Sequence, residues 1–106
     1  MPLPCPYLHG EVELTAEREA HICERHPDLL PEFREQLATT LADPDRVRRS
    51  ARMVDARLFS RWFDGIMGGK HVVVVVVSET VPQRHWVITA YLVKNLAQGG
   101  LEWKRS

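Results

Sequence analysis

The sequence is poor in the features that mark several large classes of protein. Its two cysteines, Cys5 and Cys23, are too few for a disulfide framework and lack the spacing of a metal site. The longest apolar run, Val72 to Val77, is far too short to span a bilayer, and no apolar run follows a basic segment near the first residue. We therefore expect a soluble protein of the cytoplasm, with no signal peptide and no membrane span.

Motifs of the common metal and cofactor sites are also missing. The chain contains neither HExxH nor CxxC, and it has no glycine-rich phosphate loop or dinucleotide fingerprint. The glycine pairs at 68–69 and 99–100 indicate turns. His21 and His26 are five residues apart on a predicted helix, so they point in different directions. We therefore expect no metal and no cofactor.

Net charge is absent as well, because 14 basic and 14 acidic residues balance. The two signs are nevertheless separated along the chain. Residues 1–45 hold ten carboxylates and three arginines, whereas residues 46–106 hold eleven Lys or Arg and four carboxylates. Such asymmetry favours a polyanion as partner, unless the acidic half covers the basic half in the fold. Six arginines fall within sixteen residues: Arg46, Arg48, Arg49, Arg52, Arg57 and Arg61.

At 106 residues the chain is long enough for one domain with a single core. Three prolines in residues 1–9 suggest an irregular arm, which leaves residues 10–106 for an α+β domain. Thr15 is a suitable N-cap for a helix that ends near Arg25, because Pro27 excludes His26 from helical geometry. A second helix is predicted because Pro31 suits a helical first turn and an apolar stripe recurs at helical spacing: Leu30, Phe33, Leu37 and Leu41.

After residue 45 the apolar residues recur at every second position, which indicates strands. Alternation predicts a strand over 57–63, a shorter one over 46–50 and another over 85–93. The six valines after His71 predict a central strand that is covered on both faces over part of its length. Short strands are also expected at 11–14 and 101–103. The expected fold is α+β, with two N-terminal helices packed on a three- to four-stranded antiparallel sheet.

The first helix carries the side chains best suited to proton transfer. Histidine titrates near neutral pH, and arginine is a permanently charged binder of phosphate. His21 lies near Arg18 and Arg25 on the helix surface, away from the buried Cys23, and suits a general base. The alternatives are a solvated polar face for His21 and a C-terminal cap for His26.

Two strands add candidate phosphate ligands. Arg61 lies between two phenylalanines on one face of strand 57–63, where it needs an anion, either a carboxylate or a bound phosphate. Thr89 and Tyr91 place neighbouring hydroxyls on one face of strand 85–93, although both residue types are also ordinary in strands. Together with His21, these side chains point to phosphodiester chemistry.

The ordered set HxxxRHP, RLFSRWF, GGKHVVVVVV and VITAYL resembles the small phage- and toxin-associated nucleases of the barnase–EndoU–colicin–RelE superfamily, over about residues 11–103. The resemblance implies metal-independent cleavage of RNA by attack of the ribose 2′-hydroxyl on the adjacent phosphate. It implies His21, Arg61, Thr89 and Tyr91 as catalytic residues. The expected substrate-binding residues are Arg25, His26, Arg48, Arg57, Lys70 and His85.

The neutral net charge departs from the basicity of free ribonucleases and favours a specific RNA such as tRNA. A toxin-like or mobile-element effector with a protein inhibitor would fit this resemblance, since an open sheet edge can accept an added strand. Nothing in the sequence fixes an oligomeric state. The alternative function is a non-catalytic module that binds RNA or a protein through its arginine-rich strands.

Overall fold

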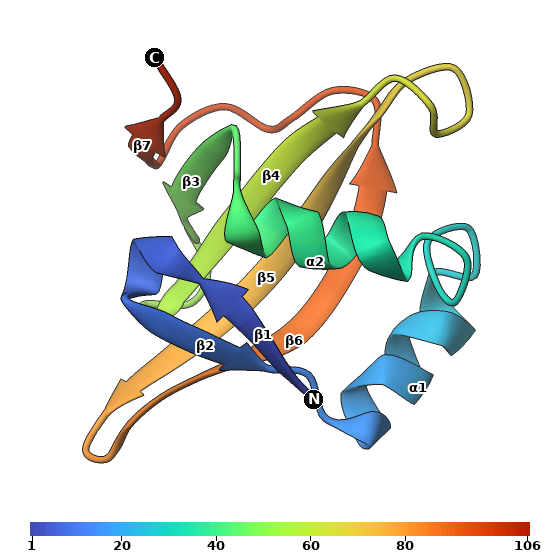
Figure 1. Ribbon diagram of the computed structural model, residues 1–106. Helices are drawn as coiled ribbons and strands as arrows, with labels where there is room; N and C mark the ends of the chain where they lie inside the picture. The colour runs from blue at the N-terminus through green and yellow to red at the C-terminus, as the bar shows by residue number, and fades with distance from the viewer.

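The computed structural model describes all of residues 1–106. It contains two helices, α1 (Ala16–Arg25) and α2 (Arg34–Ala42), and a short 3-10 turn, η1 (Pro6–Leu8). The α+β class predicted from the sequence is confirmed (Figure 1). The seven strands are β1 (Pro2–Cys5), β2 (Gly10–Glu13), β3 (Arg46–Arg49), β4 (Ala56–Phe63), β5 (Lys70–Thr80), β6 (Gln83–Val93) and β7 (Leu101–Lys104).

All seven strands belong to one sheet, in the order β1-β2-β6-β5-β4-β3-β7. β4, β5 and β6 form the expected antiparallel meander, in which Phe59 lies opposite Val74 and Val74 opposite Ala90. The sequence predicted three or four antiparallel strands, which is fewer than the seven that the sheet contains. The sheet is also mixed, because β2 joins β6 in parallel through the single pair Glu13 and Trp86.

The first nine residues are not the irregular arm that their prolines suggested. β1 pairs with β2 in antiparallel fashion, with Leu3 opposite Val12. Pro2 and Pro4 are exposed on this outermost strand, while Leu3 and Cys5 are buried. A strand at a sheet edge has a partner on one side only, so it tolerates the missing N–H of proline.

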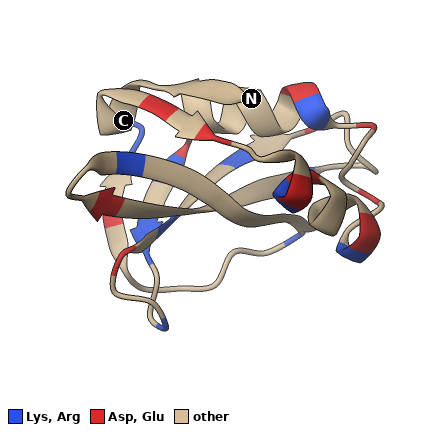
Figure 2. Ribbon diagram, turned by 90° about the horizontal axis from the view of Figure 1, so that it is seen from below, with Lys and Arg blue, Asp and Glu red and all other residues tan.

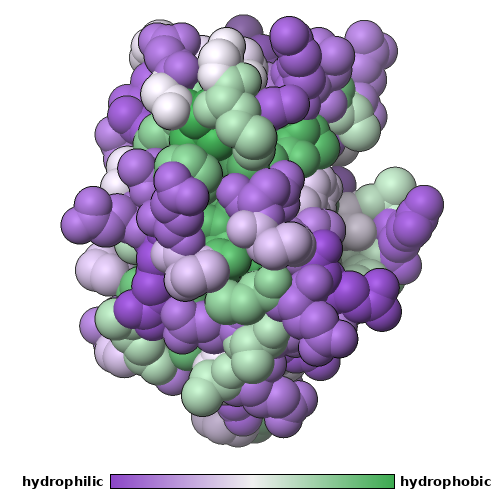
Figure 3. Space-filling model, turned by 90° about the vertical axis from the view of Figure 1, so that its right-hand side faces the viewer, coloured by the Kyte–Doolittle hydropathy of each residue, from purple (hydrophilic) through white to green (hydrophobic).

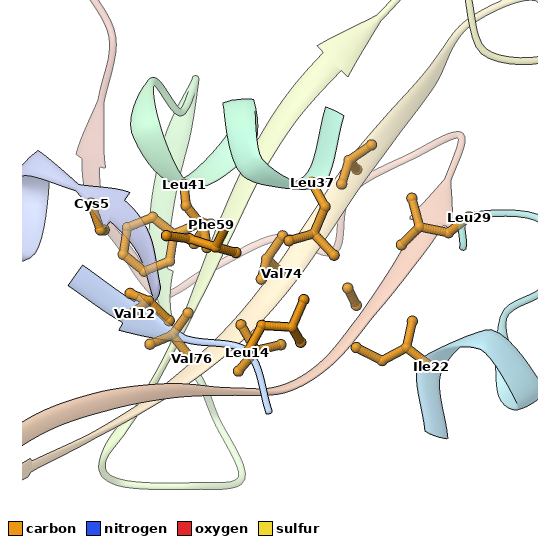
Figure 4. Packing of buried hydrophobic residues seen from close by; sticks show 14 of the residues in the cluster. Cys5, Val12, Leu14, Ile22, Leu29, Leu37, Leu41, Phe59, Val74 and Val76 are labelled. Atoms are coloured by element: carbon orange, nitrogen blue, oxygen red, sulfur yellow. The ribbon is translucent and has the colours of Figure 1, made fainter. Parts of the chain in front are cut away.

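The hydrophobic core lies between the sheet and α2. Leu37 and Leu41 of α2 point toward Phe59 and Val74 on the sheet (Figure 4). Alternate residues of a strand share one face, so Val74 lies with its neighbours 72 and 76 on the face that we call the helix face. The β1–β2 hairpin covers another part of that face beside α2 (Figure 1).

The opposite face of the sheet, which we call the outer face, carries Val73 and Val75. Val73 has no exposed surface and Val75 only 9%. The prediction that the valine run would be a central strand, covered on both faces over part of its length, is therefore confirmed. β5 lies in the middle of the sheet, between β6 and β4.

α2 starts at Arg34, later than the apolar stripe from Leu30 predicted. The chain from Pro27 to Phe33 forms turns, in which the N–H of Phe33 donates to the carbonyl oxygen of Leu29 over 2.7 Å. Pro31 disfavours helical geometry at Leu30, and both Leu29 and Leu30 are fully buried in the core. Neither helix has the length and apolar character needed to cross a membrane.

Candidate functional site

A stripe of basic side chains on α1 forms one wall of a hollow at the sheet. The hydroxyl of Thr15 accepts the N–H of Arg18 over 3.1 Å and caps the helix, as the sequence predicted. α1 carries charges of both signs (Figure 2), but Arg18, His21 and Arg25 recur at helical spacing and share one side. This first hollow is lined by Arg18, His21, Arg25, His26, Met53, Ile88 and Thr89.

β6 forms the facing wall. Arg18 Nη1 donates to the carbonyl oxygen of Ile88 over 3.4 Å, which ties α1 to this strand. The imidazole of His26 lies against the ring of Tyr91, with centroids 6.0 Å apart and planes inclined by 41°. The structure therefore brings together His21, His26, Thr89 and Tyr91.

An irregularity in β6 directs these hydroxyls to the outer face. Val75 pairs with Thr89 but Val76 pairs with Val87, so Ile88 is an extra residue and forms a bulge. Val87 consequently lies in the core, not on the side of Thr89 that strict alternation predicted. Ile88 instead lines the first hollow beside Thr89.

A second hollow continues the first along the outer face. The two share Met53, Ile88 and Thr89, so we treat them together and call them the groove. Leu58 and Val75 contribute apolar surface, and Tyr91 follows Thr89 along the strand. The remaining lining residues are Arg48, Arg49, Ser50, Ala51, Arg52, Ala97, Gln98, Gly99 and Gly100.

No aspartate or glutamate lines the groove. Of its arginines, only Arg49 has a carboxylate partner, Glu102, at 2.6 Å. The other four, together with two imidazoles, face the hollow space without a carboxylate within ion-pair distance. A neutral protein thus presents a surface that attracts anions, because its charges are sorted in space. The four unpaired arginines are Arg18, Arg25, Arg48 and Arg52.

Arg61, the fourth expected catalytic residue, is not part of the groove. Its Nη1 contacts Asp43 Oδ2 at 3.0 Å, and its guanidinium lies 5.7 Å from the ring centre of Phe63. Arg61 pairs with Val72 across the sheet, so its side chain points to the helix face, whereas Thr89 and Tyr91 point to the outer face. Of the two anions expected for Arg61, a carboxylate or a bound phosphate, the structure shows a carboxylate, that of Asp43.

Three of the expected substrate-binding residues also point to the helix face. Arg57 contacts Glu102 at 2.8 Å, and Lys70 lies at the start of β5, opposite Phe63. His85 Nδ1 is 2.7 Å from the hydroxyl of Ser78. Burial and then Arg57 lower the pKa of His85. Arg25, His26 and Arg48, the other three, line the groove.

Sequence reasoning missed two of the four unpaired arginines of the groove. Arg18 appeared only as a neighbour of His21, although its helical spacing from Arg25 places it on the same wall. Arg52 lies in the irregular segment between β3 and β4, where no periodicity predicts a direction.

On the side of the molecule that carries α1, hydrophilic residues cover most of the surface, with hydrophobic ones in narrower bands (Figure 3). No three His, Cys, Asp or Glu side chains lie close enough together to hold a metal ion. Comparisons with protein-family models, with curated proteins and with solved structures find no match. The function is therefore argued from the groove itself.

Proposed function

We propose that the protein is a metal-independent endoribonuclease that cleaves RNA in the groove. The observation that carries this proposal is the composition of the first hollow. Two imidazoles, two arginines and the Thr89 hydroxyl share it, and no carboxylate lines it. These groups supply proton transfer and charge stabilisation at a phosphodiester.

In the proposed reaction the ribose 2′-oxygen attacks the adjacent phosphorus and the bond from phosphorus to the 5′-oxygen breaks. His21 accepts the proton of the 2′-hydroxyl. His26, as imidazolium, gives a proton to the leaving 5′-oxygen. The products are a 2′,3′-cyclic phosphate and a 5′-hydroxyl, so atoms and charge balance without a co-reactant.

Two kinds of side chain assist these transfers. Arg18 and Arg25 stand beside His21 and stabilise the charge that grows on the phosphate oxygens. Thr89 and Tyr91 hold the scissile group by hydrogen bonds from their hydroxyls. Membership of the barnase–EndoU–colicin–RelE superfamily, a tRNA substrate, a protein inhibitor and a cytoplasmic toxin-like role belong to the same proposal.

The test is incubation of total RNA and tRNA with the purified protein in EDTA, followed by analysis of fragments and their end groups. We expect discrete fragments with 2′,3′-cyclic phosphate ends, and a rate lower by about 10² or more in His21→Ala, the usual scale for lost acid–base catalysis. His9→Asn is the matched control. His9 lies outside the groove, and asparagine tolerates its left-handed backbone, with φ of 59°. Equal cleavage by His21→Ala and wild type would remove His21 from the mechanism.

The second candidate is a non-catalytic RNA-binding module. It is favoured by the extent of the unpaired basic lining, which continues from α1 to Arg48 and Arg52, well beyond the histidines. This module would bind RNA in a salt-sensitive manner and leave it intact. Uncut tRNA at protein concentrations that saturate binding would decide for this candidate.

A further inference from the structure

A third hollow, of about 480 Å³, adjoins the groove on the outer face. It lies between β3, the start of β5 and the segment that leads from β6 to β7. Arg48, Ala97, Gln98 and Gly99 line both this hollow and the groove, so the two spaces are continuous at Arg48. Its other lining residues are Arg46, His71, Asn95, Leu96 and Leu101, and none of its lining residues is acidic.

Arg48 is a buried cation without a counter-ion. The residue is only 7% exposed, and the only hydrogen bond of its side chain runs from Nη1 to the carbonyl oxygen of Ala97 over 2.8 Å. Its Nε is buried and has no partner. A guanidinium carries five N–H donors, and a buried unpaired charge is strongly unfavourable.

Other arginines of the chain show what a structural role looks like. Arg57, Arg61 and Arg105 each contact a carboxylate, as do Arg34 and Arg49. Arg48 is the only buried arginine, yet it contacts none. No carboxylate of the chain lies within ion-pair distance of Arg48, so its charge is open to an anion from outside.

His71 also lines this hollow and carries a second unpaired polar atom. Its Nδ1 is buried without a hydrogen-bond partner, and its ring packs edge-on against Trp62, with centroids 4.8 Å apart. Burial, followed by the charges of Arg46 and Arg48, lowers the pKa of His71, against the opposing influence of Asp45. A neutral imidazole still offers one N–H to an anion.

The wall of the hollow is held in place by the backbone. Arg49 N–H donates to the Gly100 carbonyl over 2.7 Å. A Cβ at Gly100 would lie 2.6 Å from the Arg49 carbonyl oxygen, and its φ of +67° also favours glycine. Ala97, whose carbonyl oxygen accepts from Arg48, lies three residues earlier in the same segment.

We propose that Arg48, His71 and Arg46 form a phosphate-binding subsite. The ligand is a phosphate group, either a backbone phosphate of an RNA strand that continues from the groove or the terminal phosphate of that strand. The link to an RNA strand rests on the proposed function, whereas binding of phosphate itself does not. Arginine and imidazole N–H groups are the donors that phosphate oxygens accept.

The experiment is a titration of the His21→Ala protein with inorganic phosphate. NMR resonances of the His71 imidazole and of the amides of residues 97–99 are recorded at each phosphate concentration. We expect saturable shifts at these positions. Arg48→Met should weaken binding by about tenfold or more, the scale of a lost charged hydrogen bond. His71→Phe keeps the ring and removes its N–H, so it provides a second variant if Arg48→Met does not fold. Arg84→Met, outside the hollow and stacked on Trp86, is the control.

A second arm uses 2′-O-methyl RNA with and without a 5′-phosphate, which distinguishes a terminal phosphate from a backbone phosphate. If His71 shifts only with the 5′-phosphorylated RNA, the subsite binds the terminal phosphate. If His71 shifts with both RNAs, the subsite binds a backbone phosphate. Non-saturable shifts, or equal binding by all variants, would overturn the subsite. Saturable phosphate binding, together with no RNA cleavage by the wild-type protein, would keep the subsite and reject the ribonuclease.

Discussion

At the scale of single residues, the arginines of this chain fall into two groups according to their partners. Arg61 contacts Asp43, and Arg57 and Arg49 contact Glu102, so these three are held by carboxylates. Arg18 and Arg25 have no carboxylate partner and face the groove. The first group stabilises the fold, and we assign the second group to the substrate.

Arg61→Met should therefore leave RNA cleavage within about threefold of wild type, because its side chain lies on the helix face. Its ion pair is partly exposed, so we expect a loss of at most about 1 kcal/mol in the free energy of unfolding. Arg25→Met should instead slow cleavage by about tenfold or more. Cleavage rates in EDTA and, separately, urea denaturation test both variants. A large loss of cleavage rate in Arg61→Met would contradict the division of the arginines into two groups.

Tyr7, Glu102 and two arginines join the ends of the chain. The Tyr7 hydroxyl donates to Glu102 over 2.7 Å, and the Tyr7 ring packs against Trp103. Burial alone would raise the pKa of Glu102, but hydrogen bonds from Tyr7, Arg57 and Arg49 outweigh it and lower this pKa to about 2. Burial, followed by the hydrogen bond to Glu102, raises the pKa of Tyr7 to about 12.

These shifts predict how stability depends on pH. A lowered carboxyl pKa stabilises the fold above the ordinary value of 4.5, and this contribution is lost as the pH falls toward 2. We expect a loss of about 2 kcal/mol from Glu102, less than the full shift because the side chain is partly solvated. Urea denaturation from pH 7 to pH 2 measures it, and Glu102→Gln should lack this component. A raised tyrosine pKa has the opposite sense, with stability lost as the pH rises from 10 to 12.

Residue types and spacing were enough to select His21, Thr89 and Tyr91 as neighbours in one site. They were not enough for Arg61, because the choice between a carboxylate and a phosphate depends on Asp43, eighteen residues away. Alternation correctly placed Arg61 on the same face of the strand as Phe59 and Phe63. What alternation could not supply was which face of the sheet the helices cover.

At the scale of elements, α1 depends on its N-cap to hold the imidazoles against β6. The hydroxyl of Thr15 satisfies one of the free N–H groups at the start of the helix. Thr15→Ala should lower the free energy of unfolding by about 1 kcal/mol, whereas Thr15→Asn should leave it unchanged, because asparagine caps a helix at least as well as threonine. Chemical denaturation of both proteins makes this comparison. Equal stability of the two variants would show that the cap does not matter.

The bulge in β6 could not be predicted from the alternation of residues along this strand. A strand was correctly predicted over 85–93, but strict alternation assigned Val87 and Thr89 to the same face. The pairing with β5 inserts Ile88 as an extra residue and separates them. Register with a neighbouring strand is a tertiary property, so the sequence of β6 alone does not contain it.

At the scale of the whole molecule, the groove draws its unpaired cations from both halves of the chain, Arg18 and Arg25 from residues 1–45 and Arg48 and Arg52 from residues 46–106. The acidic N-terminal half does not cover the groove, although this was the alternative to polyanion binding. The α+β class and the central valine strand followed from periodicity. The seven-stranded mixed sheet did not, because β1 contains two prolines and β2 meets β6 through one pair only.

This distribution predicts a salt-dependent affinity for RNA. If the four unpaired arginines of the groove each contact one phosphate, log affinity should fall against log salt with a slope of about −3. Arg25→Gln should reduce the magnitude of this slope by about 0.7. Arg105→Gln is the control, because Arg105 contacts Asp43 and lies outside the groove. Equal effects of the two substitutions would contradict a localised RNA surface.

The most direct measurement of the central claim is an NMR footprint of 2′-O-methyl RNA, which cannot be cleaved, on the wild-type protein. RNA bound in the groove should shift the amide and imidazole resonances of His21, Thr89 and Tyr91 and those of residues 97–100. Resonances of Asp43 and Arg61 should stay unchanged. Shifts on the helix face without shifts at His21 and Thr89, or none at saturating RNA, would contradict the claim that this groove holds RNA.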